Sequence, residues 1–168
     1  MARVASRAPR APKSRSATYA FGGIFRAPLA FVYDWCLDYS PGDAKLSKES
    51  FVRKIVHRSA TRAVYEDLEE GPGGWRWSHI VVTKHPPNAW HAAITGSHRH
   101  WSLDYALRKL PRGRTQLLAR GRRRPTAIGE PNPPRTELEH ELREMWRNYG
   151  RALEHDYRAS SRRGSGRK

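Results

Sequence analysis

The period of the apolar residues changes once along the chain, near residue 130, and this change constrains the fold more than any other feature. Before it, several segments alternate apolar and polar residues, and WSLDYALRKL (residues 101–110) is the clearest of them. After it, apolar residues recur at helical spacing from residue 136 to residue 157. A long amphipathic helix that follows a series of strands buries its apolar stripe, and a sheet is the largest apolar surface available.

Six segments have the length and alternation of strands and are separated by turn signals such as GPGG and HPPN. They are residues 51–59, 61–70, 75–83, 89–96, 101–110 and 115–123. Short connections predict antiparallel pairing, because a parallel pair needs a crossover. In the segment 75–83, the parity that carries Trp75 and Trp77 is expected to face the core.

The beginning of the domain has its own pattern. Residues 18–26 predict a first strand with a bulge at Gly22-Gly23, and Pro28 is well placed to open a short helix. A second short helical turn is predicted around residues 43–47. For the long helix, Asn132 before Pro133 is one candidate N-cap, and Thr136 with Glu139 is another.

Length and charge predict one domain between two tails. The chain has 168 residues and a formal charge of +16, but ten of its 32 basic residues lie in residues 1–16 and 158–168, which contain no acid. Residues 17–157 therefore hold 22 basic and 16 acidic residues, a net charge of only +6. We expect a domain over residues 17–158 and disordered basic tails at 1–16 and 159–168, because the tails have too few apolar residues to fold.

The remaining composition excludes several classes of protein. The single Cys36 excludes an internal disulfide. No apolar run approaches the roughly 20 residues that span a bilayer, and the first 16 residues lack the apolar region of a secretory signal. A cytoplasmic protein without a transmembrane segment is the expectation.

Several segments resemble the START-like, or SRPBCC, superfamily. IFRAPLAFVYDWCLDYSPGD is similar to the superfamily's opening strand and helix, and GWRWSHIVVTKHPPNAWHA, GSHRHWSLDYALRKLPRGRTQLLARGRRRP and WRNYGRALEHDYR resemble its polyketide cyclase/dehydrase-like branch. The resemblance covers about residues 18–158 and contains no catalytic signature. It implies an α+β helix-grip fold: a curved seven-stranded antiparallel sheet around a long C-terminal helix, with two short helices after the first strand. It also implies an apolar cavity between sheet and helix, as in lipid carriers, hormone-binding proteins and aromatase/cyclases.

Large rings on the expected inner faces are the candidates for lining that cavity. They are Trp77, Trp90, Trp101, Tyr105, Trp146 and Tyr149. Binding pockets for small molecules are mostly apolar with few polar groups, which fits this set. The alternative interpretation is that the rings only fill the core.

Three polar residues are candidates for chemistry inside the cavity. His79 shares a parity with Trp77, and Glu66 shares one with Val64 and Leu68. Either side chain can move a proton if burial shifts its pKa toward the working pH, as a cyclase that forms rings by aldol condensation requires. Tyr105 can donate a hydrogen bond to a developing enolate. The alternative is a hydrogen-bonded interior histidine and a carboxylate at the rim.

His91, His98, His100 and Asp104 invite a metal hypothesis, since imidazole and carboxylate suit zinc or iron. Ligands on strands must share a face, however, and polar residues at strand ends are usually solvated. We expect no metal and no cofactor.

Arg120, Arg122, Arg123 and Arg124 form the one basic cluster in the sequence of the domain. Together with the tails they can bind nucleic acid or an anionic membrane surface without specificity. The alternative is a solvated strand end.

Taken together, the sequence predicts a protein that encloses a hydrophobic small molecule, lipid or polyketide-like, as a carrier, sensor or cyclase. The competing hypothesis is a basic-tailed accessory protein that associates with nucleic acid or a ribonucleoprotein and has no catalytic activity. The residues do not decide between an enzyme and a binding protein.

Overall fold

The computed structural model describes residues 16–40, 46, 51–71 and 74–165. Their elements, in chain order, are β1 (Ala17–Phe25), α1 (Leu29–Cys36), β2 (Phe51–Arg58), β3 (Arg62–Gly71), β4 (Gly74–His85), β5 (Ala89–Gly96), β6 (Arg99–Leu110), β7 (Arg114–Pro125) and α3 (Arg135–Ser165). This order of elements confirms the predicted α+β helix-grip plan.

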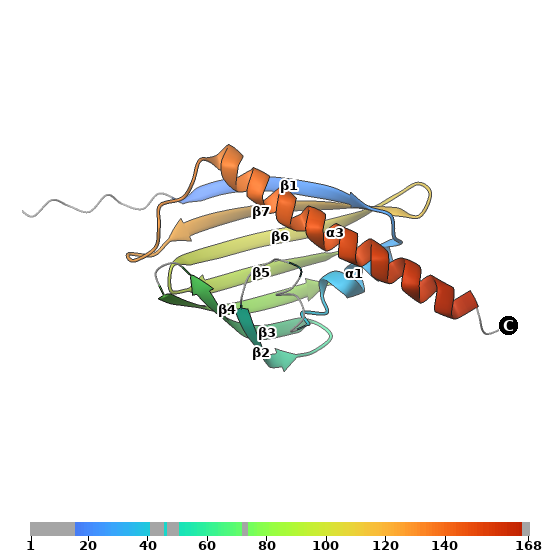
Figure 1. Cartoon of the computed structure of the whole chain (residues 1–168), viewed down its shortest axis with the longest axis horizontal. Helices are drawn as coiled ribbons and strands as arrows, with labels where there is room; N and C mark the ends of the chain where they lie inside the picture. The colour runs from blue at the N-terminus through green and yellow to red at the C-terminus, as the bar shows by residue number, and fades with distance from the viewer. Residues whose placement is uncertain (1–15, 41–45, 47–50, 72–73, 166–168) are drawn as a thin grey trace, which may run out of the picture.

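The seven strands form one antiparallel sheet in the order β1-β7-β6-β5-β4-β3-β2. Each of β2 to β6 pairs with the next strand along the chain, and β1 completes the sheet by pairing with β7. Figure 1 shows α3 running diagonally across one face of this sheet, with α1 beside the middle of the helix. The face under α3 is the inner face, and it contains most of the buried core.

Two carboxylates fasten α3 to the edge strand β1 and to the residue that follows it. Glu139 accepts a hydrogen bond from the backbone N–H of Ala20 at 2.9 Å, and Glu154 accepts one from the N–H of Arg26 at the same distance. An edge strand has backbone donors that no neighbouring strand satisfies, so these side chains replace a missing strand partner. The helix is therefore held at one edge of the sheet, which determines where space is left.

The short helix α1 packs against the C-terminal half of α3. Pro28 precedes its first residue, Val32 is completely buried, and the indole N–H of Trp35 donates to Asp156 of α3 at 3.0 Å. The ring of Phe31 lies 5.1 Å from that of Tyr157. These contacts place one end of α1 over the sheet.

Some local predictions differ from the structure. The predicted bulge at Gly22-Gly23 is wrong: β1 pairs with β7 in unbroken register, and the irregularity falls in β2, between Ile55 and His57. The alternation of β1 continues through both glycines, so no extra residue is accommodated there.

The helix boundaries differ as well. The long helix begins at Arg135, between the two predicted N-caps, and it extends to Ser165, beyond the expected domain boundary at residue 158. Residues 1–15, most of the predicted helical turn at 43–47 and residues 166–168 lie outside the described residues.

Candidate functional site

A cavity of about 700 Å³ lies between the inner face of the sheet and α3. Its wall comes from α1, α3 and strands β2 to β7. Most of this wall is apolar, and its aliphatic and small members are Ile80, Ala92, Ile94, Leu103, Leu138, Leu142 and Met145. A volume of this size is typical of pockets for small molecules.

Five aromatic side chains form a continuous chain of contacts along the wall. Trp90 and Tyr105 stack on the sheet with centroids 4.8 Å apart, and Tyr105 lies 5.7 Å from Trp146 on the helix. Trp146 in turn contacts Tyr149 at 5.6 Å, and Tyr149 lies 6.4 Å from Trp35 of α1. Aromatic rings from the sheet and from both helices thus border one space, which suits a ligand that contains rings.

Two partly buried tyrosines, Tyr39 and Tyr105, supply hydroxyl groups to the same wall. Burial raises the pKa of Tyr105 and of Tyr39 well above the usual tyrosine value, and neighbouring tyrosines raise it further. A phenol with a raised pKa stays neutral and donates a hydrogen bond, but it is not a base at neutral pH. These groups can orient a carbonyl oxygen of a ligand.

Polar groups gather elsewhere in the wall. The guanidinium of Arg53 makes two hydrogen bonds of 2.8 Å to the carboxylate of Asp67, an ion pair with both side chains largely buried. The same guanidinium lies 4.3 Å from the centroid of the Tyr65 ring. Bidentate pairs of this kind are geometrically specific, so they fix the side chains rather than leave them to bind a ligand.

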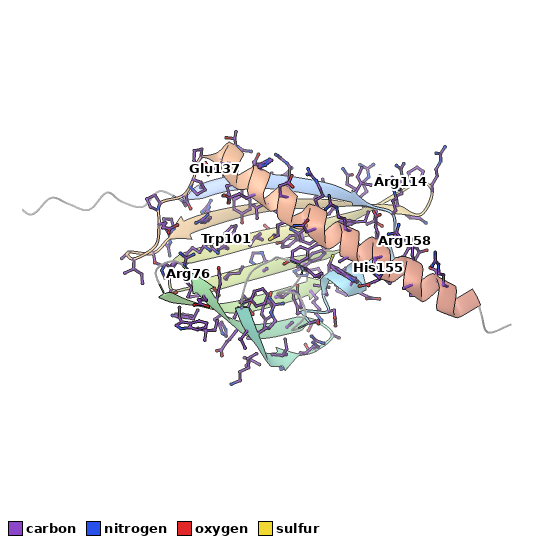
Figure 2. The ribbon with its side chains drawn as sticks, viewed as in Figure 1. Arg76, Trp101, Arg114, Glu137, His155 and Arg158 are labelled. Carbon is purple, nitrogen blue, oxygen red and sulfur yellow. The ribbon has the colours of Figure 1, made fainter. Side chains whose placement is uncertain are left out.

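A second basic group of residues lies around Trp101. Arg99 precedes Trp101 by two positions on β6, and Arg123 on the neighbouring strand β7 pairs with Trp101 in register. Both guanidinium groups lie over the Trp101 ring, Arg99 at 5.5 Å and Arg123 at 5.3 Å from its centroid. Burial lowers the pKa of Arg123, and the nearby charge of Arg99 lowers it further. Figure 2 shows Trp101 on the sheet at the end of the molecule where α3 begins, the end that also holds Arg76 and Glu137.

Five of the six predicted ligand-lining rings line the cavity, namely Trp90, Trp101, Tyr105, Trp146 and Tyr149. The prediction for the sixth, Trp77, is wrong. This side chain is 50% exposed, because in β4 the inward residues are Ser78, Ile80 and Val82. Alternation then places Trp77 on the outer face of the sheet.

The expected interior positions of His79 and Glu66 are also wrong. They are cross-strand neighbours on the outer face, 3.6 Å apart, with 40% and 53% of their side chains exposed. An exposed pair of this kind stays hydrated, so neither side chain lies in the water-excluded interior that the catalytic hypothesis requires. Of the three predicted catalytic candidates, Tyr105 alone faces the cavity.

The basic cluster on β7 is divided by the same alternation. Arg120, Arg122 and Arg124 are exposed on the outer face, whereas Arg123 points into the cavity and is only 7% exposed. The sequence cluster is therefore two different features of the structure. Its outward members form a short solvated row, and Arg123 belongs to the cavity.

The histidines of the metal hypothesis do not converge. His91 is bound to Asp104 at 2.7 Å on the outer face, and His98 contacts the hydroxyl of Ser97 at 2.9 Å. Within residues 16–40, 46, 51–71 and 74–165, no three histidine, cysteine or acidic side chains form a group suited to a metal ion.

Among the helices of the described part of the chain, none combines the length and the apolar character needed to cross a bilayer.

Sequence comparisons find no relatives: no protein-family model matches the chain, and no curated protein matches it. Solved structures do match. The Zhui aromatase/cyclase from Streptomyces sp. R1128 superposes with a TM-score of 0.63 at 16% identity, over 86% of this chain and 94% of that one. The protein TTHA0849 from Thermus thermophilus superposes with a TM-score of 0.62 at 14% identity, over 86% of this chain and 99% of that one.

A START superfamily protein from Mycobacterium smegmatis gives a TM-score of 0.58 at 13% identity, over 84% of this chain and 97% of that one. At these identities the likeness concerns the fold, and each match covers nearly the whole of its partner. The protein therefore has the START-like helix-grip fold that these structures share.

Proposed function

We propose that this protein binds a hydrophobic small molecule that contains rings, in the cavity between the sheet and α3, as a carrier or sensor. The observation that carries the proposal is the cavity of about 700 Å³, walled by the chain of rings from Trp90 to Trp35. Apolar volume of this kind is a cost to stability unless an apolar ligand occupies it. The likeness to an aromatase/cyclase favours a polyketide-like compound as the ligand.

The wall favours binding over catalysis. Tyr105 and Tyr39 have raised pKa values and remain neutral, and the carboxylate of Asp67 is held in its pair with Arg53. Among the described residues that line the cavity, His140 is the one imidazole, and it is exposed on α3. The two hydroxyls are thus donors rather than bases, the carboxylate is paired and the imidazole is solvated, so none of these four groups is placed as a buried general base.

A direct test uses anthracene methanol, a neutral ring compound, and follows its binding by isothermal titration calorimetry. Trp146→Ala removes a ring from the cavity wall, and Trp77→Ala is the matched control because it removes the same side chain from the outer face. A ring contact contributes about 0.5–1.5 kcal/mol beyond the burial of its area, so the first variant is expected to bind about tenfold more weakly. The control is expected to bind as the unmodified protein does.

A second variant guards against a general loss of structure. Ala92→Leu adds volume to the wall from a buried position without removing any ring, and it is expected to reduce binding while circular dichroism stays unchanged. Equal binding by the protein, Trp146→Ala and Ala92→Leu would contradict the proposal, as would no binding to the unmodified protein.

The alternative function, association with nucleic acid, has one structural observation in its favour: Arg120, Arg122 and Arg124 are exposed together on the outer face of β7. Protein purified from its host separates the two functions. An organic extract that contains a bound lipid or polyketide, detected by mass spectrometry, supports the cavity. Co-purifying RNA that is lost at moderate salt supports the arginines, since phosphate contacts weaken as salt rises.

A further inference from the structure

Arg123 is a buried cation whose guanidinium has no acidic partner among the described residues. Its Nε is buried without a hydrogen-bond partner, and no carboxylate of the described chain lies within ion-pair distance of it. A buried charge is costly unless an opposite charge and hydrogen bonds compensate it. The side chain nevertheless points into the ligand cavity rather than toward solvent.

The acidic side chains around Arg123 are engaged elsewhere or exposed. Glu69 lies 4.0 Å from Arg99, and Glu130 pairs with Arg76 at 3.6 Å. Glu141 on α3 favours the charged form of Arg123, but its side chain is exposed to solvent. Arg123 is thus a buried charge with which none of these three carboxylates pairs.

A neutral hydrogen-bond donor, Tyr19, lies behind Trp101 at this end of the sheet. The hydroxyl of Tyr19 is buried and has no partner, and its ring lies 5.4 Å from that of Trp101, the ring that both Arg99 and Arg123 contact. Tyr19 also pairs in register with Gly121, two positions before Arg123 on β7. Its pKa is raised by burial, so it stays a donor at neutral pH.

We propose that the ligand is an amphipathic organic acid, whose carboxylate binds Arg123 and Arg99 while its rings occupy the aromatic part of the cavity. This inference rests on the proposed function and adds a substrate class to it. A carboxylate supplies the opposite charge that Arg123 lacks and accepts hydrogen bonds from its guanidinium. Trp101 lies between the aromatic part of the cavity and the two arginines, because it lines the cavity and also contacts both guanidinium groups.

The test compares anthracene carboxylic acid with anthracene methanol, which has the same rings and no charge, by calorimetry at neutral pH. Charge-assisted hydrogen bonds contribute about 1.5–3 kcal/mol, so the acid is expected to bind about 10- to 100-fold more tightly than the alcohol. Arg123→Gln is expected to remove most of this preference, so that the variant binds the acid and the alcohol with similar affinities. Arg122→Gln is the matched control, since the neighbouring side chain points outward.

A measurement on the unmodified protein keeps the test valid if Arg123→Gln does not fold. Affinity for the acid is expected to fall as the pH is lowered through the pKa of the free carboxylic acid, whereas affinity for the alcohol stays constant. Equal affinities for acid and alcohol, or an equal loss with Arg122→Gln, would overturn the anion site and leave the proposed function standing. Binding of neither compound would overturn both.

Discussion

Adding one methyl group at Gly121 tests the packing at the charged end of the cavity. A Cβ at this position would lie 2.5 Å from Cζ of Tyr19, nearer still to its hydroxyl oxygen, and 2.9 Å from the backbone oxygen of Ser102. Carbon atoms in good contact are about 3.5–4.0 Å apart, so the ring must move by about 1 Å. The ring has little room, because it is 3% exposed and lies edge-on against Trp101.

Gly121→Ala is therefore expected to lower the free energy of unfolding by about 1–3 kcal/mol, the usual cost of overpacking a core. For a domain of this size that corresponds to a fall in Tm of about 2–12 °C. Thermal denaturation followed by circular dichroism, together with urea denaturation, measures both quantities. Gly23→Ala is the control, because it adds the same methyl group on β1 where the nearest atom, in the Phe25 ring, is 3.9 Å away.

A double-mutant cycle identifies Tyr19 as the cause. In a Tyr19→Leu background the end of the ring is gone, so the cost of Gly121→Ala is expected to fall by more than half. If Gly121→Ala costs the same in both backgrounds, or no more than Gly23→Ala, the reasoning is refuted.

Three further predictions concern stability. Arg123→Met replaces a buried, uncompensated charge with an apolar side chain, so the ligand-free protein is expected to gain about 1 kcal/mol in urea denaturation; a loss of stability would contradict the absence of a counter-charge. Glu139→Gln weakens the bond to the N–H of Ala20 and is expected to cost about 1 kcal/mol at neutral pH. The Ala20 N–H lowers the pKa of Glu139 from 4.5, so this contribution is present above pH 4.5 and is lost as the pH falls through the lowered value; a difference that persists in acid would refute it. Trp35→Phe removes the bond to Asp156 and is expected to lower Tm by a few degrees; if Trp35→Phe lowers Tm equally in an Asp156→Ala background, which has no side-chain acceptor, that contact is disproved.

The strands are predictable from sequence, but the direction of some side chains is not. In β6 a single parity is apolar, so the pattern places Trp101 and Tyr105 on the correct face. In β4 both parities are apolar around Ile80, and the large indole of Trp77 favours the wrong one. Where both faces of a strand carry apolar residues, the alternation does not determine which face is buried.

The charged part of the site escapes prediction for a related reason. Asp67 faces the cavity although it is acidic, because Arg53 on the neighbouring strand pairs with it. Alternation assigns charged residues to solvent unless their partner is known, and the partner lies on another strand. For Arg99 the sequence does contain a signal that it faces the cavity. It lies two positions before Trp101 on the same strand, and residues two apart on a strand point to the same face.

The cavity exists because α3 is attached to one edge of the sheet. Glu139 and Glu154 bind the backbone at β1, and Gly150 brings the helix so close that an added Cβ would lie 3.0 Å from the Phe25 ring. The helix accordingly contacts β1 more than any other strand. A curved sheet continues beyond the reach of a rod held at its edge, and Trp146 projects from α3 into the space that remains. The opening for a ligand is thus a consequence of where two carboxylates and one glycine lie along the helix.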